Sequence, residues 1–289
     1  MTDAPQKCGA FLFPYDLNYT QLYITLSIYA TGTLSASFEH LTQPPLNVGL
    51  GLSYYNIFSN PAGSFMDPAS SANQNNLQVS LLSGKKFNLR QLTHHSVAAA
   101  FPIKGNGMAI GLRSFGTKQY RESIFSMGYG HKIKNRMSIG VSTNLYELSI
   151  PGYGAAQTLG TTVSWHIQVT NQIKWGTILH NINSPTIGQS NDPLPQLIIS
   201  TIVFQPIRTV TVLLEGEQDT DYSSQIKVGF SIQPKSYLRI QTGYISSTGQ
   251  LTGAIGLKFY SININYALAN HPELGPSHWM EFHFPFRRK

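Results

Sequence analysis

The C-terminal part of the chain, from Ser224 onward, alternates apolar with polar residues at a period of two. In residues 225–233 the apolar positions are Ile226, Val228, Phe230 and Ile232, and polar residues or glycine stand between them. The same alternation recurs over residues 237–244 and 261–266. A period of two is typical of β-strands that have one apolar and one polar face.

Similar segments recur along most of the chain. We count about fourteen, near residues 77–83, 95–102, 107–115, 121–131, 136–148, 157–170, 172–180, 196–205, 208–217, 224–233, 236–246, 250–259, 260–267 and 277–286. Repeated alternating segments of about ten residues, separated by turns, are typical of transmembrane β-barrels. The pattern therefore predicts an all-β protein, with a transmembrane antiparallel barrel of about fourteen strands over residues 77–286.

The connections between these segments alternate in length. Tight links are expected at His131–Asn135, Thr170–Asn171, Gln205–Ile207, Gln233–Ser236 and Phe259–Tyr260. Longer ones are expected at Ile150–Ala156, Asn181–Pro195, Glu217–Ser223 and Asn270–Ser277. Short turns at one end and longer loops at the other are typical of barrels in bacterial outer membranes. We therefore expect the outer membrane of a Gram-negative-type bacterium as the location and its lipid as a partner.

The N-terminal region lacks this alternation. Residues 38–76 are rich in Pro, Gly, Asn and Ser, and they are too polar to face lipid. Irregular backbone at membrane depth must be enclosed by protein or line a water-filled lumen. We therefore expect residues 38–76 to form a hatch, or plug, inside the barrel or at its mouth.

The two ends of the chain carry further segments. Residues 22–36 are moderately apolar and end in small residues, which predicts a signal peptide over residues 1–37 with cleavage near Ser35–Ser37. The alternative is an extended N-terminus with a first strand, because Ile24, Leu26 and Ile28 also alternate with polar residues. Residues 287–289, at the other end, form a basic tail.

Composition supports a membrane barrel and argues against nucleic-acid binding. Only 11% of the residues are charged, whereas about 25% is usual in soluble proteins. No stretch of 18 apolar residues occurs, so helical spans do not explain the low charge. The net charge is +7, but the basic residues are scattered, with no arginine-rich helix and no zinc-ligand spacing.

Two motifs resemble those of a known family. The first is Asn60-Pro61-Ala62-Gly63, which follows the glycine-containing stretch Asn47–Leu52. The second is Asn265-Tyr266-Ala267 followed by His271-Pro272-Glu273-Leu274-Gly275 and His278, directly before the last alternating segment. Together they resemble the FadL-like outer-membrane barrels, and most closely the short branch around the type IX secretion protein PorV.

The resemblance implies a fourteen-stranded barrel with the N-terminal segment folded into the lumen as a hatch. It implies a non-enzymatic protein that takes part in protein secretion, with secretion-system components and secreted cargo as partners. The first alternative is a FadL-like transporter of hydrophobic small molecules, and the second is a non-specific porin. No cofactor, no metal ligand and no catalytic residue is expected.

The hatch turn Asn60–Gly63 is the main candidate site. Pro61 fixes φ, and Gly63 is expected to let the backbone approach the wall closely. Side chains on the polar phase of the C-terminal strands are expected to face the lumen and hold this turn, namely Arg239, Gln241, Asn263 and Asn265.

Two further clusters have competing interpretations. His271, Glu273 and His278 are expected to brace the last loop by hydrogen bonds, and a metal site is the alternative. Ser164 and His166 lie on one face of a single strand and suggest a hydrolase pair. A hydrolase would also need a polar residue to orient the histidine, and the sequence assigns none.

Overall fold

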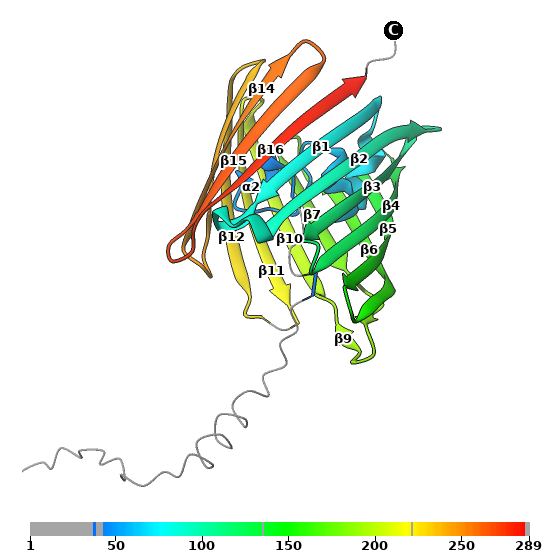
Figure 1. Ribbon diagram of the computed structural model, residues 1–289. Coiled ribbons are helices and arrows are strands. Elements are labelled where there is room, and N and C mark those ends of the chain that lie inside the picture. Colours follow the sequence, from blue (N-terminus) through cyan, green and yellow to red (C-terminus); the bar gives the residue numbers. More distant parts are fainter. Residues whose placement is uncertain (1–36, 39–42, 135, 221, 287–289) are drawn as a thin grey trace, which may run out of the picture. The chain divides into compact units, whose positions relative to one another are not determined.

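A single closed barrel makes up most of the structure, a computed structural model that describes residues 37–38, 43–134, 136–220 and 222–286 (Figure 1). Its fourteen strands are β1 (Leu77–Lys85), β2 (Thr93–Ile103), β3 (Asn106–Gly116), β4 (Arg121–Ile133), β5 (Met137–Ile150), β6 (Gly154–Gln168), β7 (Ile173–His180), β10 (Leu197–Ile207), β11 (Val210–Asp219), β12 (Gln225–Lys235), β13 (Leu238–Ile245), β14 (Gln250–Phe259), β15 (Ile262–His271) and β16 (Gly275–Phe286). The predicted barrel and its strand number are confirmed. The expected signal peptide lies outside the described residues, apart from Ser37, and so does the basic tail.

Each strand pairs antiparallel with its neighbours along the chain, and β1 pairs with β16 to close the barrel. The one interruption follows β7, which pairs with β10. Between these two strands, β8 (Thr186–Ile187) and β9 (Asp192–Pro193) form a separate small hairpin. In the described part of the chain, no helix has the length and apolar character needed to cross a membrane.

The two faces of the wall follow the alternation in the sequence. In β12, Val228 is 44% exposed on the outer face, while its neighbour Lys227 is 2% exposed and points inward. The other barrel strands repeat this arrangement, so apolar side chains cover the outside, while polar, small and some large apolar side chains, such as Ile178, Leu213 and Trp279, face inward. The predicted facing of the strands is therefore confirmed.

The connections differ in length between the two ends of the barrel. At what we call the short-turn end, the links are two to four residues long, at 104–105, 134–136, 169–172, 208–209, 236–237 and 260–261. At the opposite, long-loop end the links span three to sixteen residues. Two predictions made for this end were wrong, because the expected long loops Ile150–Ala156 and Asn270–Ser277 are turns of three residues.

These two connections are shorter than predicted because the strands on either side stay paired for longer. Ile150 pairs with Gly154, and His271 pairs with Gly275, so both hairpins continue past the point where apolar alternation stops. Both glycines have positive φ, 96° for Gly154 and 82° for Gly275, which glycine adopts without steric cost. Hydrogen bonds between strands do not require an apolar outer face. A strand that extends beyond the lipid therefore need not alternate apolar with polar residues, and the sequence does not show that the strand continues.

Residues 43–76, called the hatch below, lie inside the barrel (Figure 1). The hatch contains three short helices: α2 (Pro45–Val48), η1 (Pro61–Phe65) and η2 (Pro68–Asn73). Each begins with a proline, whose fixed φ suits the first turn of a helix and whose missing N–H would be unpaired there anyway. Helix α2 packs against β14–β16, η1 against β1–β5, and η2 against β2–β6.

Candidate functional site

Glycines on the inner face of the wall allow the hatch to lie directly against the strands. A Cβ atom added at Gly140 would lie 2.3 Å from the Ala69 backbone nitrogen, and one at Gly130 would lie 2.4 Å from the Ala72 nitrogen. At Gly107 the added atom would lie 1.8 Å from the carbonyl oxygen of Ser71. The backbone of η2 therefore occupies space that any side chain would fill.

The expected hatch turn forms the start of η1. Asn60 caps this helix, because its Oδ1 accepts a hydrogen bond of 2.9 Å from the Ala62 N–H. Its Nδ2 donates to Glu281 Oε1 on β16 at 2.7 Å. Glu281 is fully buried and also accepts from Asn265 Nδ2 at 2.8 Å and from the Ser80 hydroxyl. One buried carboxylate thus joins the hatch turn to β1, β15 and β16.

The other three side chains expected to hold the turn lie elsewhere. Arg239 stacks over the ring of Phe58, with 4.4 Å from its guanidinium carbon to the ring centroid, and Asn263 contacts His283 at 3.2 Å. The remaining one, Gln241, is buried against the hatch backbone at Gly49. The structure therefore brings only Asn265 of the four into the network of the turn.

Glu281, which is the central acceptor of that network, was not identified from the sequence. Its signal in the sequence is an inward-phase carboxylate between Met280 and Phe282, both exposed on the outer face. The expectation for Gly63 was also wrong. An added Cβ there would lie 2.6 Å from Asn56 Cγ, so Gly63 makes room for a hatch side chain and not for the wall.

A second attachment joins η2 to β6 through Asp67, whose side chain is fully buried. Asp67 Oδ1 accepts from Ser164 Oγ at 2.9 Å, and both carboxylate oxygens lie 2.8 Å from His166 Nε2. Ser164 Oγ also accepts the Ala69 N–H at 2.8 Å. A hydrolase nucleophile needs its base within hydrogen-bond reach of the hydroxyl. Here the serine donates to the carboxylate and the histidine contacts the same carboxylate, so the pair attaches the hatch to the wall.

A third attachment lies on β11 and β12. Glu215 Oε2 accepts from Ser53 Oγ of the hatch at 2.7 Å. Lys227 Nζ lies 3.3 Å from Glu215 Oε1 and donates to the Leu52 carbonyl at 3.0 Å. Lys227 also forms an ion pair with Glu217, so one buried cation lies between two carboxylates, and hydrogen bonds to hatch backbone and hydroxyl groups complete the cluster. Removal of Lys227 would leave two buried carboxylates without a compensating charge.

Two tyrosines of the hatch stay neutral beside these groups. Burial raises the pKa of the Tyr54 phenol well above its usual value, and the carboxylates of Glu217 and Glu215 raise it further. Burial also raises the pKa of Tyr55, with a smaller contribution from Asp67. Lys227 Nζ lies 4.3 Å from the Tyr54 ring centroid, where the electron-rich face of the ring attracts the cation.

The last-loop motif shapes a turn at the long-loop end. His271 Nδ1 accepts the backbone N–H groups of Glu273 and Leu274, at 3.2 and 3.3 Å. Gly275 takes positive φ where β16 begins, and Pro272 stands in the turn. In this turn Glu273 contributes its backbone N–H, and His271 is the side chain that braces it.

His278 does not join that turn. It lies within β16, where its Nδ1 is 2.7 Å from the Tyr266 hydroxyl. The described residues contain no group of three or more His, Cys, Asp or Glu side chains placed to hold a metal ion. His271 and His278 therefore have separate structural contacts.

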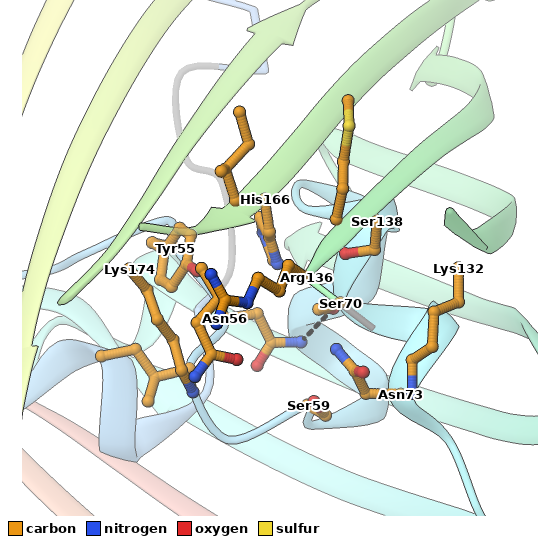
Figure 2. A pocket seen from close by; sticks show the side chains of 14 residues that line it. Tyr55, Asn56, Ser59, Ser70, Asn73, Lys132, Arg136, Ser138, His166 and Lys174 are labelled. Carbon is orange, nitrogen blue, oxygen red and sulfur yellow. Dashed lines mark hydrogen bonds between the residues drawn. The ribbon is translucent and has the colours of Figure 1, made fainter. Parts of the chain in front are cut away.

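Cavities open at both ends of the lumen. At the long-loop end a cavity of about 450 Å³ is lined by Tyr54, Leu197 and Tyr222, among others. At the short-turn end a cavity of about 260 Å³ lies beside Arg239, and another of about 230 Å³ lies beside Arg136 (Figure 2). The hatch contributes residues to all three.

Outer-membrane channels of known structure share this fold. A FadL homologue from Pseudomonas aeruginosa matches with a TM-score of 0.60 and 10% identity, over 85% of this chain and 99% of the other. CymD, described as a monoaromatic hydrocarbon channel, matches with a TM-score of 0.59 and 10% identity, over 87% and 100% of the two chains. The toluene transporter TodX from P. putida matches at 0.55 and 9%, over 78% and 94%.

These similarities define the class of fold. No protein-family model matches the chain, and no curated protein matches it in sequence. At about 10% identity the likeness shows a common architecture, which is the closed barrel of FadL-type outer-membrane channels. Of these three neighbours, CymD is described as a channel and TodX as a transporter.

Proposed function

We propose that this protein is an outer-membrane channel for small hydrophobic molecules in a Gram-negative-type bacterium, with the hatch as its gate. The observation that carries the proposal is the way in which the hatch is attached inside a complete barrel. Asp67, Glu215 and Glu281 hold it through buried hydrogen bonds. Lumen water can replace such bonds when the hatch moves. Movement would also separate Val48, Leu50 and Phe65 from their apolar contacts on the wall, but it would leave the strand ladder of the barrel intact.

The long-loop cavity is large enough to admit a small molecule. Its volume of about 450 Å³ suits a molecule the size of one aromatic ring, and Tyr54, Leu197 and Tyr222 offer apolar surface in a lining that also contains the charged Lys86, Glu217 and Asp219. The fold is shared with CymD and TodX, which are described as a monoaromatic hydrocarbon channel and a toluene transporter. Monoaromatic hydrocarbons are therefore the first substrates to test.

The other two candidates have weaker support. The resemblance of Asn60–Gly63 and His271–His278 to PorV favours a secretion partner, but the fold comparisons favour the channel. A non-specific porin needs an open lumen, and the hatch fills part of it. A secretion role predicts that secretion components and cargo with a shared C-terminal domain are encoded nearby.

The test measures uptake of radiolabelled toluene by cells of a Gram-negative host that lacks its own hydrocarbon channels. Expression of the full chain is expected to raise the initial uptake rate. The loss variant is Leu197→Arg, which fills part of the long-loop cavity with a bulky cation and is expected to remove the increase while the barrel still inserts. Unchanged uptake with the unaltered protein inserted in the outer membrane would reject the proposal.

A further inference from the structure

Basic residues are concentrated at the short-turn end of the barrel. Nine lysines and arginines lie in its turns or within three residues of them: Lys104, Lys132, Lys134, Arg136, Lys174, Arg208, Lys235, Arg239 and Lys258. No Asp or Glu of the described residues lies in the same zone. A region with one sign of charge and low-dielectric walls raises the local concentration of the opposite ion.

Three of these cations converge on one cavity. Lys132 on β4, Arg136 in the turn before β5 and Lys174 on β7 line the short-turn cavity of about 230 Å³ (Figure 2). Lys132 and Lys174 lie on the inward phase of their strands. No acidic residue lines it. In the described part of the chain, none of the three lies within ion-pair distance of a carboxylate.

The hatch and β6 add neutral hydrogen-bond donors to the same cavity. Asn73 at the end of η2 and Gln168 at the end of β6 both line it (Figure 2 labels Asn73). Neither side chain amide makes a hydrogen bond within the described residues. His166 also borders the cavity, but its Nε2 contacts Asp67. The cavity therefore combines three unpaired cations with two unused amides.

We propose that this cavity binds an oxyanion, a phosphate or a carboxylate group, that enters from the short-turn side. Hydrogen bonds from a lysine or arginine cation to such a group are stronger than hydrogen bonds between neutral groups. The planar guanidinium group of arginine can also donate to two oxygens of the anion at once. Cations of the wall and Asn73 of the hatch would share the anion. A bound anion would thus link the wall to the hatch and would stabilise the present position of the hatch in addition to the Asp67–His166 contact. This inference does not depend on the proposed transport, because it requires no molecule to pass through the barrel.

The test measures binding of inorganic phosphate to the full-length protein in a non-ionic detergent, by isothermal titration calorimetry at constant ionic strength against chloride. The variant is Arg136→Gln with Lys174→Gln, and it is expected to bind phosphate at least about tenfold more weakly, since two charged donors are lost. The matched control, Arg208→Gln with Lys258→Gln, removes the same charge from the same end but outside the cavity. It is expected to keep phosphate affinity within about twofold, because screening weakens distant surface charges.

A second measurement distinguishes a free anion from a lipid headgroup. The protein is placed in nanodiscs of phosphatidylglycerol or phosphatidylcholine without phosphate, and retained lipid is measured by native mass spectrometry. Retention of phosphatidylglycerol that depends on Arg136 and Lys174 supports the oxyanion site with lipid as its source. Binding of neither probe, or equal loss in both double variants, overturns the proposal. Gel migration with and without heating checks that each variant is folded.

Discussion

Gly130 and Gly140, on neighbouring strands of the wall, leave room for the backbone of η2. We predict that Gly140→Val displaces the hatch, because an added Cβ would meet the Ala69 nitrogen at 2.3 Å. Overpacking of this kind costs about 1–3 kcal/mol. Since the barrel ladder is unchanged, the cost falls on the hatch, and conductance in planar bilayers is expected to rise. Gly216→Val is the control, because nothing lies within 4 Å of a Cβ added there.

The carboxylate of Glu281 holds the hatch turn by accepting hydrogen bonds from Asn60 and, on the wall, from Asn265. Glu281→Leu leaves the Asn60 and Asn265 amides without their acceptor, at a cost of about 1–3 kcal/mol for each unsatisfied buried group. We expect faster hydrogen exchange of the amides in η1, measured by mass spectrometry. Glu273→Leu, in an exposed turn, is the control and should leave this exchange unchanged. Equal protection of η1 in both variants would show that Glu281 does not hold the turn.

Strands are the elements on which the membrane assignment depends. Val228 lies near the middle of β12 on the outer face and is 44% exposed. We predict that Val228→Arg destabilises the folded barrel by about 2–4 kcal/mol, the usual cost of a cation at the bilayer midplane. The measurement is denaturant unfolding in lipid vesicles. Phe259→Arg, at the strand end beside a short turn, should cost only about 0–1 kcal/mol.

The short helices of the hatch depend for their stability on contacts with the wall. None of α2, η1 and η2 exceeds six residues, which is too short for a helix to be stable alone in water. They exist because their faces pack on the wall and because Asn60 and the initial prolines satisfy or remove N–H groups at their starts. Their sequences carry turn signals but no helical periodicity.

In the whole molecule, the fold of the hatch depends on the barrel more than the fold of the barrel depends on the hatch. The strand ladder closes through β1 and β16 without a contribution from the hatch. We therefore predict that deletion of residues 43–76 leaves a folded barrel with a higher and steadier conductance. Lumen water would solvate Glu215 and Glu281, the wall carboxylates that the hatch now covers. Unchanged conductance and unchanged sensitivity to large antibiotics would mean that the hatch does not close the lumen.

The sequence by itself determined the barrel, the number of its strands and the face that residues within the predicted strands present. The reason is that a strand in a membrane wall has one lipid-facing and one lumen-facing side, so the requirement repeats every second residue. The polar, proline-rich character of residues 38–76 likewise excluded lipid contact. Where strands leave the membrane this requirement ends, and there the predicted loops 150–156 and 270–277 were wrong.

Only the tertiary structure decided which inward side chains meet the hatch. Alternation specifies the face of Glu281, Ser164 and His166 but not their height in the lumen or their partners. Asn60 and Glu281 are 221 residues apart, and Asp67 and His166 are 99 apart. Their contacts arise because the closed barrel brings distant strands around one segment. Such pairings depend on the closure of the barrel and on the depth of the hatch, and neither is encoded in a local pattern.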